Sequence, residues 1–478
     1  MAINNVDQLV LGKLLQITFS KGFRRQLVRD HRDWESVKQM TVGMPGGREH
    51  RFMFQVGGGP AAIQYAAIGA SGAFPAAQRS AVEEKVAIFK ELNATIEIDY
   101  MLFERLKMAP AKYADNLAME LEDKLVYLKR RVAADLYNDG LGVLGTVGAA
   151  ALTDEGVASG KVGLSLKAAA LRGHIGWFEY DDFLVKASPA GAITAGAEMP
   201  NGVFAWKVVS IDRENDKLVL QAIDASGAPV ALANTAASLI TEDDLLYRGT
   251  TAASHSRTDL TDGTPRVLVG GSLVAQDYGT ATEIMAGLGA LVANDGRQVH
   301  GISMSGVTGS TVKDCGGAPI DVTFIQQALS QVKTAVGQGR YKYSQLLCAP
   351  EMLDSLIEGR ETDRRFNSIE DSTRGVRKFV YQHAEDAVEF VTSEFARKSE
   401  AIALPSGKGE ESKVVEFVGT DFKAVEVPGS SSKFHLRPTA NGGHEKKLVS
   451  YMFGLGVLIN QHPKACLKIK NFLNSEPA

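Results

Sequence analysis

Residues 115–142 contain one long run of helical periodicity that ends in glycines. Apolar residues recur there at spacings of four, four, three, four and four, and most positions between them are charged. That spacing places them on one stripe of a helix, where burial of each side chain contributes about 1.5–3 kcal/mol. Pro110 suits a first helical turn, and Gly140 suits a left-handed stop. The sequence therefore predicts a long helix that packs through Leu117, Leu121, Leu125, Leu128, Val132 and Leu136.

Two extended runs precede this helix, at residues 50–56 and 85–103. The residues between them are rich in Gly, Ala and Pro and poor in charge, which is typical of a long hairpin tip. Such a hairpin buries little against its own domain and needs a partner surface. We expect the tip to make contacts between subunits through Ile63, Tyr65, Ile68 and Phe74.

Residues 1–45 are predicted to form an arm rather than a domain. The segment has an excess of basic residues and one apolar side. It could be a solvated amphipathic segment that packs on a neighbouring surface, or it could contact a polyanion such as a DNA backbone. Four arginines would face DNA in the second interpretation: Arg24, Arg25, Arg29 and Arg32.

The remaining chain alternates between β-rich and mixed regions. Residues 204–211 and 218–223 read as a hairpin within a β-rich stretch, which predicts a small barrel or sandwich inserted into the larger chain. Residues 320–358 read as a helix, a buried strand and a second helix that begins at Pro350. Two strand-like runs follow near the end, at 447–459 and 465–472.

Charge, cysteine content and hydropathy exclude several classes of protein. The formal net charge of −4 excludes a globally basic nucleic-acid binder. Cys315, Cys348 and Cys466 lie far apart, which favours neither a disulfide scaffold nor a thiolate zinc site and fits folding in a reducing compartment. We expect no secretion signal and no membrane span, because no uncharged apolar run is long enough.

Several short motifs match catalytic patterns without the context that the chemistry needs. Residues 140–145 read GLGVLG, but a dinucleotide site needs a strand before that pattern and a helix after it, and here a helix precedes it. His31-Arg-Asp33 and Ser310–Lys313 lack their companion motifs. Two acidic clusters are better explained as solvated turns than as cation sites: Glu179, Asp181 and Asp182, and Glu242, Asp243 and Asp244. We therefore expect no catalytic residue, cofactor or metal.

Three stretches together resemble the major capsid proteins of tailed bacteriophages, the Hong Kong 97 fold. DNLAMELEDKLVYLKRRVAADLYNDGLG (115–142) is similar to the spine helix of that family and the loop after it. IDVTFIQQALSQVKTAVGQGRYKYSQLLCAPEMLDSL (320–356) is similar to the helix–strand–helix of its axial domain. EKKLVSYMFGLGVLINQHPKACLKIKNF (445–472) is similar to its closing segment, in which a proline separates an apolar strand from a last peripheral strand.

The resemblance implies an α+β fold of the Hong Kong 97 type with an added β-rich subdomain. The implied division is an N-terminal arm (1–45), an extended hairpin loop (46–103), a peripheral domain with the spine helix (104–170), an inserted β-rich subdomain (171–250), an axial domain (251–425) and a return to the peripheral domain (426–478).

The function implied by the resemblance is structural. The chain would assemble with itself into hexamers and pentamers of an icosahedral shell around a phage double-stranded DNA genome, without sequence-specific contacts. Scaffolding, portal and decoration proteins would be further partners, and the virion capsid, assembled in the host cytoplasm, would be the location. Two alternatives remain open at this point: an encapsulin-type cellular shell protein, and a dinucleotide-dependent enzyme built on residues 140–145.

Overall fold

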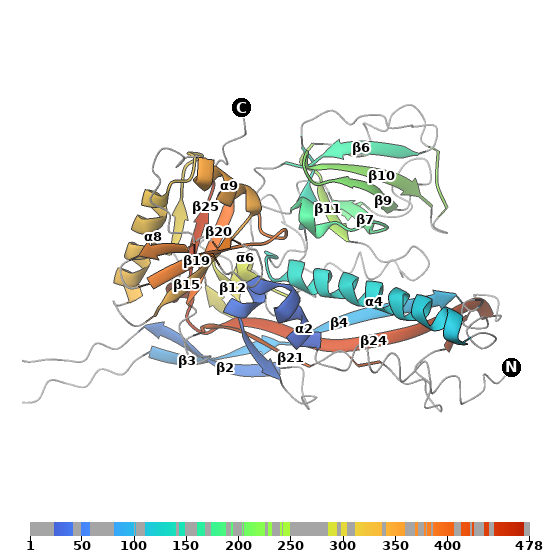
Figure 1. The fold of residues 1–478 in the computed structure, drawn as a ribbon, viewed down its shortest axis with the longest axis horizontal. Coiled ribbons are helices and arrows are strands. Elements are labelled where there is room, and N and C mark those ends of the chain that lie inside the picture. The colour runs from blue at the N-terminus through green and yellow to red at the C-terminus, as the bar shows by residue number, and fades with distance from the viewer. Residues whose placement is uncertain are drawn as a thin grey trace, which may run out of the picture.

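The computed structural model has a mixed α+β architecture (Figure 1). The residues that it describes are 23–41, 49–57, 81–99, 101, 110–139, 143–148, 160–167, 174–187, 193–194, 203, 205–224, 228–231, 240, 242–248, 285–293, 298–303, 311–336, 341–358, 369–370, 377–378, 380–383, 386–405, 413–420, 423–424, 435–438 and 444–472. Within these parts of the chain, no helix has the length and apolar character that a membrane crossing requires.

The predicted long helix is α4 (Pro110–Asp135), which lies along a six-stranded sheet (Figure 1). The central strand β24 (His444–Asn460) pairs antiparallel with β4 (Lys90–Asp99) and with β21 (Val415–Gly419). The shorter strands of this sheet are β1 (Lys38–Thr41), β22 (Lys423–Ala424) and β23 (His435–Pro438). This long layer forms one side of the molecule.

The described part of the predicted apolar stripe is buried. Leu125 and Val132 are 5% and 3% exposed, and Leu128 is partly buried against the same core. Leu136 is fully buried and follows the last helical residue. The side chains of Leu117 and Leu121, and residue Gly140, lie outside the described residues.

A second sheet carries two helices and forms an α/β body. Its strand order is β14 (Val312–Asp314), β25 (Leu467–Lys470), β20 (Glu400–Pro405), β15 (Tyr343–Cys348), β19 (Asp386–Thr392) and β18 (Val380–His383). The helices are α8 (Val322–Val336) and α9 (Pro350–Glu358), as the sequence predicts. An apolar cluster that includes Ile325, Leu329, Val332, Leu346 and Met352 joins α8 and α9 to the sheet.

The last strand differs from the prediction. We expected residues 465–472 to return to the peripheral domain, but β25 pairs with β14 and β20 in the α/β body. The physical reason is the short 3-10 turn η8 (Pro463–Ala465), which redirects the chain after β24. The closing segment therefore belongs to both sheets.

The β-rich region is a closed barrel that begins earlier than the predicted residue 171. Its strand order is β5 (Val143–Thr146), β11 (Leu245–Arg248), β7 (Phe183–Ala187), β9 (Ala205–Asp212), β10 (Lys217–Ile223) and β6 (Lys161–Ser165), and β8 (Ile193–Thr194) pairs with β7. A bridge between Val147 and Leu166 joins the two ends of this sheet. The barrel therefore takes in strands that we had assigned to the peripheral domain. Its interior includes Trp206, Leu218, Leu220 and Leu246, all fully buried.

The part of the predicted arm that the structure describes belongs to the core. It forms α2 (Phe23–Asp30), the 3-10 helix η1 (Arg32–Ser36) and β1, which pairs with β21. Trp34 is fully buried and lies edge-on to Phe417, with ring centroids 5.3 Å apart. Leu27 is also fully buried. The apolar side of this segment therefore packs within its own subunit.

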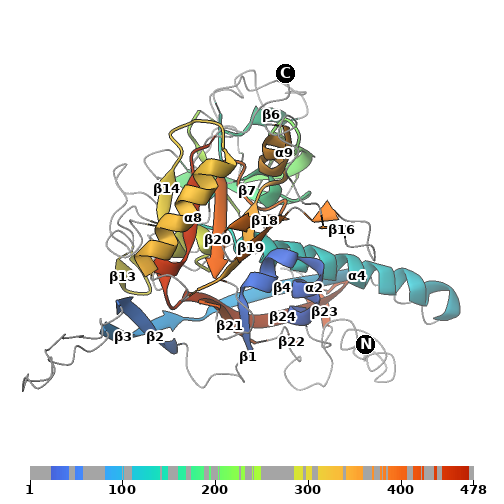
Figure 2. The same ribbon diagram turned by 60° about the vertical axis from the view of Figure 1, so that its left-hand side comes forward.

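The predicted hairpin begins as a two-stranded ribbon at one end of the long sheet (Figure 2). Strand β2 (Glu49–Gly57) pairs antiparallel with β3 (Ala81–Ile88), and the chain then continues into β4. Phe52 and Phe54 are buried, whereas Met53 between them is 62% exposed. The tip residues Ile63, Tyr65, Ile68 and Phe74 lie outside the described residues.

The remaining described elements are short: η3 (Ile175–Trp177), α6 (Leu288–Leu291), β12 (Gln298–Val299), β13 (Ile302–Ser303), β16 (Ile369–Glu370) and β17 (Arg377–Lys378). Of these, α6 closes the end of α4. The Leu288 amide donates to the Leu136 carbonyl at 2.6 Å. A Cβ on Gly287 would lie 2.4 Å from the Asp135 carbonyl oxygen, so only glycine allows this approach.

Candidate functional site

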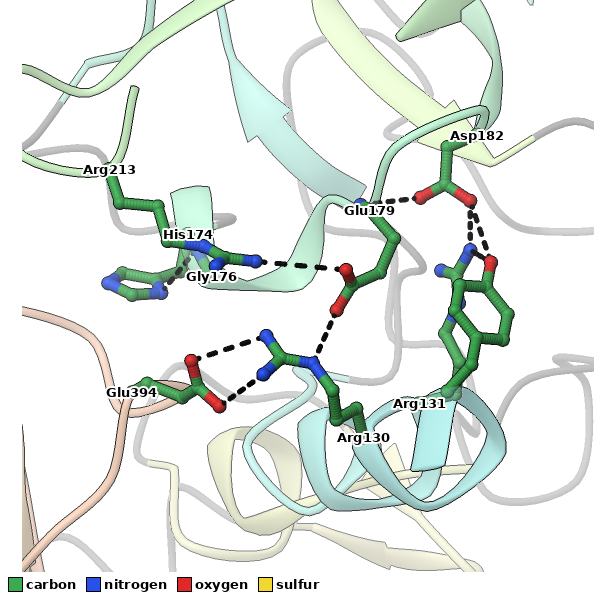
Figure 3. Close-up of polar contacts among 9 residues, drawn as sticks. Arg130, Arg131, His174, Gly176, Glu179, Asp182, Arg213 and Glu394 are labelled. Carbon is green, nitrogen blue, oxygen red and sulfur yellow. Dashed lines mark hydrogen bonds and ion pairs between the residues drawn. The ribbon is translucent and has the colours of Figure 1, made fainter. Parts of the chain in front are cut away.

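Residues from three parts of the chain meet through polar contacts where the barrel rests on α4 (Figure 3). We call this region the barrel junction. The helix contributes Tyr127, Arg130 and Arg131; the barrel contributes His174, Gly176, Trp177, Glu179, Asp182, Arg213 and Asp216; and the segment after β19 contributes Glu394, Phe395, Arg397 and Lys398.

Arg130 links all three parts through one guanidinium group. Its Nε donates to Glu179 Oε1 of the barrel at 2.9 Å, and its Nη1 lies 2.9 Å from Glu394 Oε1 of the α/β body. Burial lowers the pKa of Arg130, but the hydrogen bonds and charges of Glu179 and Glu394 outweigh it and raise the pKa above its usual range. Arg213 adds a longer contact to Glu179, at 3.7 Å. Arg130 therefore remains charged and holds both carboxylates.

Arg131 makes a separate contact with the barrel on the neighbouring side of the helix. It pairs with Asp182, and Tyr127 Oη also donates to Asp182 Oδ1, at 3.2 Å. Asp182 Oδ2 accepts from the Glu179 amide at 3.0 Å. Burial raises the pKa of Asp182 and raises that of Tyr127 to about 12, although Arg131 lowers both. Consecutive residues of one helix thus hold two acidic residues of the barrel.

The barrel also contacts the segment after β19 directly. Trp177 Nε1 donates to the Phe395 carbonyl at 2.9 Å, and the Arg397 guanidinium lies 5.2 Å from the Trp177 ring centroid. A Cβ on Gly176 would lie 2.2 Å from the Glu394 carbonyl oxygen. Lys398 Nζ contacts Asp216 Oδ2 at 3.0 Å. The close approach at Gly176 fixes how deeply the barrel sits.

His174 lies at the edge of the same contact. Its Nδ1 accepts the Gly176 amide hydrogen at 3.0 Å, so this nitrogen carries no proton in the docked arrangement. Burial and the nearby cations Lys398, Arg397 and Arg213 lower the pKa of His174 to about 3. The ring is therefore neutral at physiological pH.

A buried group of four charges lies beneath Trp177. Arg397 contacts Asp139 at 3.5 Å and Glu400 at 3.3 Å, and Lys468 Nζ contacts Glu400 at 3.1 Å. Burial raises the pKa of Glu400, but Lys468 and Arg397 outweigh it and lower the pKa below its usual range. The group contains two cations and two anions, so it is electrically balanced. It connects the end of α4 with β20 and β25 of the α/β body.

The predicted DNA-facing arginines do not form one described cluster. Arg29 is exposed, and its Nε donates to Asp30 Oδ1 at 3.0 Å. Arg32 Nη2 donates to Glu389 Oε1 at 2.8 Å, which ties η1 to β19. The side chains of Arg24 and Arg25 lie outside the described residues. DNA contact by these residues stays a prediction.

The motifs that matched catalytic patterns have structural explanations. Residues Val143–Thr146, which contain the end of GLGVLG, form a barrel strand rather than the helix that a dinucleotide site requires. Asp33 is buried, accepts from Ser393 Oγ at 3.0 Å, and has its pKa raised by burial. Among the described residues, no group of three or more His, Cys, Asp or Glu side chains is placed to hold a metal ion.

The barrel junction is a feature that we did not predict from the sequence. We explained Glu179, Asp181 and Asp182 as a solvated turn, yet Glu179 and Asp182 face α4. The sequence feature that could have indicated a contact here is the pair Arg130–Arg131, on the same helix as the apolar stripe. No pattern in the sequence indicates which acidic cluster these arginines would meet, because the contact joins residues about 50 positions apart through tertiary packing.

No protein-family model and no curated protein matches this sequence. Among solved structures, the chain is similar to one in the Cyanophage A-1(L) capsid asymmetric unit, with a TM-score of 0.42 and 8% identity over 92% of this chain and 90% of that chain. It is also similar to a chain of the capsid of an empty GTA particle, with a TM-score of 0.36 and 8% identity over 94% and 90% of the two chains.

A shorter match is to the holo-SrpI encapsulin complex of Synechococcus elongatus PCC 7942. It has a TM-score of 0.25 and 15% identity, and it covers 39% of this chain and 61% of that chain. The cyanophage capsid and the encapsulin are of the two kinds of shell that the sequence analysis named.

Proposed function

We propose that this chain is a shell-forming major capsid protein of the Hong Kong 97 type, without enzymatic activity. The elements that support this assignment are α4 lying along β24 and β4, the separate α/β body, and the ribbon β2–β3. They follow one another in the order that the resemblance of residues 115–142, 320–356 and 445–472 implies.

The observation that carries the proposal is the ribbon β2–β3. Within the described residues, its two strands pair only with each other. An isolated two-stranded ribbon is at best marginally stable in water. One face packs inward through Phe52 and Phe54, while Arg51, Met53 and Glu84 remain exposed on the other. A neighbouring copy of the chain would bury that second face, and a repeated contact of this kind builds a shell.

The partners follow from this assignment. The chain would form hexamers and pentamers of an icosahedral particle that encloses double-stranded DNA, and scaffolding, portal and decoration proteins would act with it. The hairpin tip with Ile63, Tyr65, Ile68 and Phe74 would lie on an adjacent subunit. Arg24, Arg25, Arg29 and Arg32 would contact DNA phosphates without reading sequence.

Deletion of residues 58–78 tests the proposal. We expect the unmodified chain, expressed with its scaffolding protein, to give hollow shells or ring-shaped capsomers in electron microscopy and sedimentation. The deletion should abolish them and change the melting temperature little, because it leaves Leu125 and Val132 in place. The control Leu125→Asp should unfold the subunit by burying a charge.

Two outcomes would contradict the proposal. Stable monomers of the unmodified chain in the presence of scaffold would argue against a shell. A hairpin deletion that melts as early as Leu125→Asp would show that the tip belongs to the subunit core and not to an interface.

A further inference from the structure

We propose that His300 is a wedge that holds the ribbon β2–β3 away from the edge of β24 and so sets the direction in which the ribbon projects. The importance of that direction rests on the proposed function, in which the ribbon meets a neighbouring copy, whereas the wedge itself is a property of one subunit. Three observations support it: the backbone conformation of His300, its two contacts, and the point at which the β4–β24 ladder ends.

His300 lies in a tight turn whose backbone does not favour a histidine. Strands β12 and β13 leave only His300 and Gly301 between them as a two-residue loop. Both residues have positive φ angles, 53° and 72°, as a type I′ turn requires. Glycine or asparagine is the usual first residue of such a turn, because a larger side chain is crowded in the left-handed conformation. The choice of histidine is therefore explained by what its side chain contacts.

The imidazole of His300 contacts two different elements. The residue is 3% exposed, and its Nε2 lies 3.0 Å from the carbonyl oxygen of Leu458 in β24. A carbonyl oxygen can only accept, so Nε2 carries the proton and donates it. Phe52 of the ribbon meets the same ring edge-on, at an interplanar angle of 83° with ring centroids 6.0 Å apart. This arrangement of two aromatic rings is a favourable one. One side chain therefore joins the ribbon to β24.

The Leu458 carbonyl lies where β24 loses its neighbouring strand. Strand β4 pairs with β24 as far as Gly456, which lies opposite Lys90. The Leu455 carbonyl and the Gln461 amide both bond to residues that flank β21. Because successive backbone groups of a strand alternate between its two edges, the Leu458 carbonyl faces the other edge, the one that β4 occupies up to Gly456. The imidazole therefore takes the place of the next residue pair of this ladder.

The register of the ladder shows which pair the imidazole replaces. Hydrogen-bonded pairs recur at every second residue, so the next pair after Gly456 with Lys90 would be Leu458 with Ile88. Ile88 is the last residue of β3, and one residue separates it from the start of β4. With His300 bound to the Leu458 carbonyl, the ladder cannot take up this pair. Strand β3 consequently diverges from β24 and pairs with β2 as the ribbon.

Apolar burial also holds the base of the ribbon. Phe52, Phe54 and Ala87 belong to the same buried core as Leu458. These contacts keep the base of the ribbon attached to the subunit, whereas the hydrogen bond joins one defined donor to one defined acceptor on β24. Loss of the imidazole should therefore change the direction of the ribbon without detaching it.

Substitutions of His300 separate the wedge from the turn. His300→Gly removes the ring and suits the left-handed turn, so the hairpin β12–β13 should persist. His300→Gln keeps an amide donor on a side chain long enough to approach the Leu458 carbonyl. Spin labels at Glu84→Cys on the ribbon and Gln327→Cys on α8, in a Cys315→Ser background, report the position of the ribbon by pulsed electron resonance. Both labelled positions are exposed, and the other two cysteines are buried.

We expect a shift of the mean distance between the labels in His300→Gly, because Ile88 can then move to the separation of a ladder pair, about 5.5 Å between Cα atoms. His300→Gln should keep the distance of the unmodified chain, even where its less suitable turn lowers the melting temperature. A merely structural role would change the melting temperature without this difference in distance. Full-length labelled chains diluted into unlabelled protein give distances within one subunit.

Asn471→Gly is the matched control. It replaces another left-handed residue, with a φ of 59°, in the α/β body and should leave the distance unchanged. His300→Asn, which tolerates the same turn and has a shorter side chain, replaces His300→Gly if the latter folds poorly. An unchanged distance in this variant, or an equal shift in His300→Gln, would overturn the proposal. A failure of the unmodified chain to form shells would contradict the proposed function instead, because the distances are measured within one subunit.

Discussion

Helix α8 and the barrel both lie against a neighbouring part of the molecule, but charged contacts contribute to the attachment of the barrel far more than to that of α8. Helix α8 packs through Ile325, Leu329 and Val332, which are at most 1% exposed. The barrel shares buried apolar residues such as Ile175 and Trp177 with the core that includes α4, and it is also attached to α4 through ion pairs made by Arg130 and Arg131, whose side chains are 24% and 13% exposed. The stabilisation from apolar burial depends on the buried area and changes little when two elements rotate slightly against each other. Ion pairs require a defined geometry and so fix the orientation of the two elements, but each contributes little to the free energy of folding. Helix α8 is therefore held by apolar burial, whereas directional ion pairs add to apolar burial in fixing the orientation of the barrel.

The largest effect should come from the apolar attachment. Leu329→Ala should lower the free energy of unfolding by about 2–5 kcal/mol, because it leaves a cavity among fully buried neighbours. Chemical denaturation followed by circular dichroism measures the change. Gln326→Ala on the exposed side of α8 is the control and should change stability by less than about 0.5 kcal/mol. Equal effects of the two variants would mean that α8 is not anchored by this face.

An intermediate effect should come from the polar attachment. Arg130→Ala removes the contacts to Glu179 and Glu394 and should weaken docking by about 1–3 kcal/mol, while the barrel stays folded. Exposure of Trp177 should then shift the tryptophan emission to longer wavelength before global unfolding. Lys124→Ala, an exposed residue of the same helix, should leave the emission unchanged. A loss of barrel structure in Arg130→Ala would show that the barrel needs its contact with α4 in order to fold, which would contradict this prediction.

The smallest effect should come from a single hydroxyl group. Tyr127→Phe keeps the ring beneath the Arg131 guanidinium, 4.9 Å from the ring centroid, and removes the hydrogen bond to Asp182. Because Tyr127 is 40% exposed, water replaces part of the loss, and we expect at most about 1 kcal/mol. The same emission measurement, titrated with denaturant, detects it. An effect as large as that of Arg130→Ala would mean that Asp182 depends on Tyr127 rather than on Arg131.

The sequence predicted the elements whose signal is local. The stripe through Leu125 and Val132 predicted α4, and Pro350 predicted the start of α9. The hairpin of residues 204–223 appears as β9 and β10. These succeed because helical periodicity, a proline at a first turn and a tight hairpin are properties of consecutive residues.

The sequence did not predict where distant elements meet. Val143–Thr146 follows a helix and gives no sign that it joins β11, about 100 residues later, to close a barrel. The apolar side of residues 23–41 indicated an amphipathic segment, but it did not indicate whether that side packs on another subunit or, as the structure shows, on Phe417 of the same chain. Arg130 finds its partners Glu179 and Glu394 only once the barrel and the segment after β19 lie against α4. The contacts of the barrel junction could therefore not be predicted from the sequence, although the sequence contains each of the residues that make them.

Strand β24 is the element through which a pulling force would pass along the long sheet. It pairs with β4 at ten successive positions, from Lys447 with Asp99 to Gly456 with Lys90, and with β21 from Gly456 to Asn460. Ladder hydrogen bonds lie perpendicular to the strands, so tension along the layer loads many of them together in shear instead of opening them one by one. The chain then passes through η8 directly into β25 of the α/β body. A pull on the far end of the long layer is therefore transmitted to the α/β body through one continuous backbone.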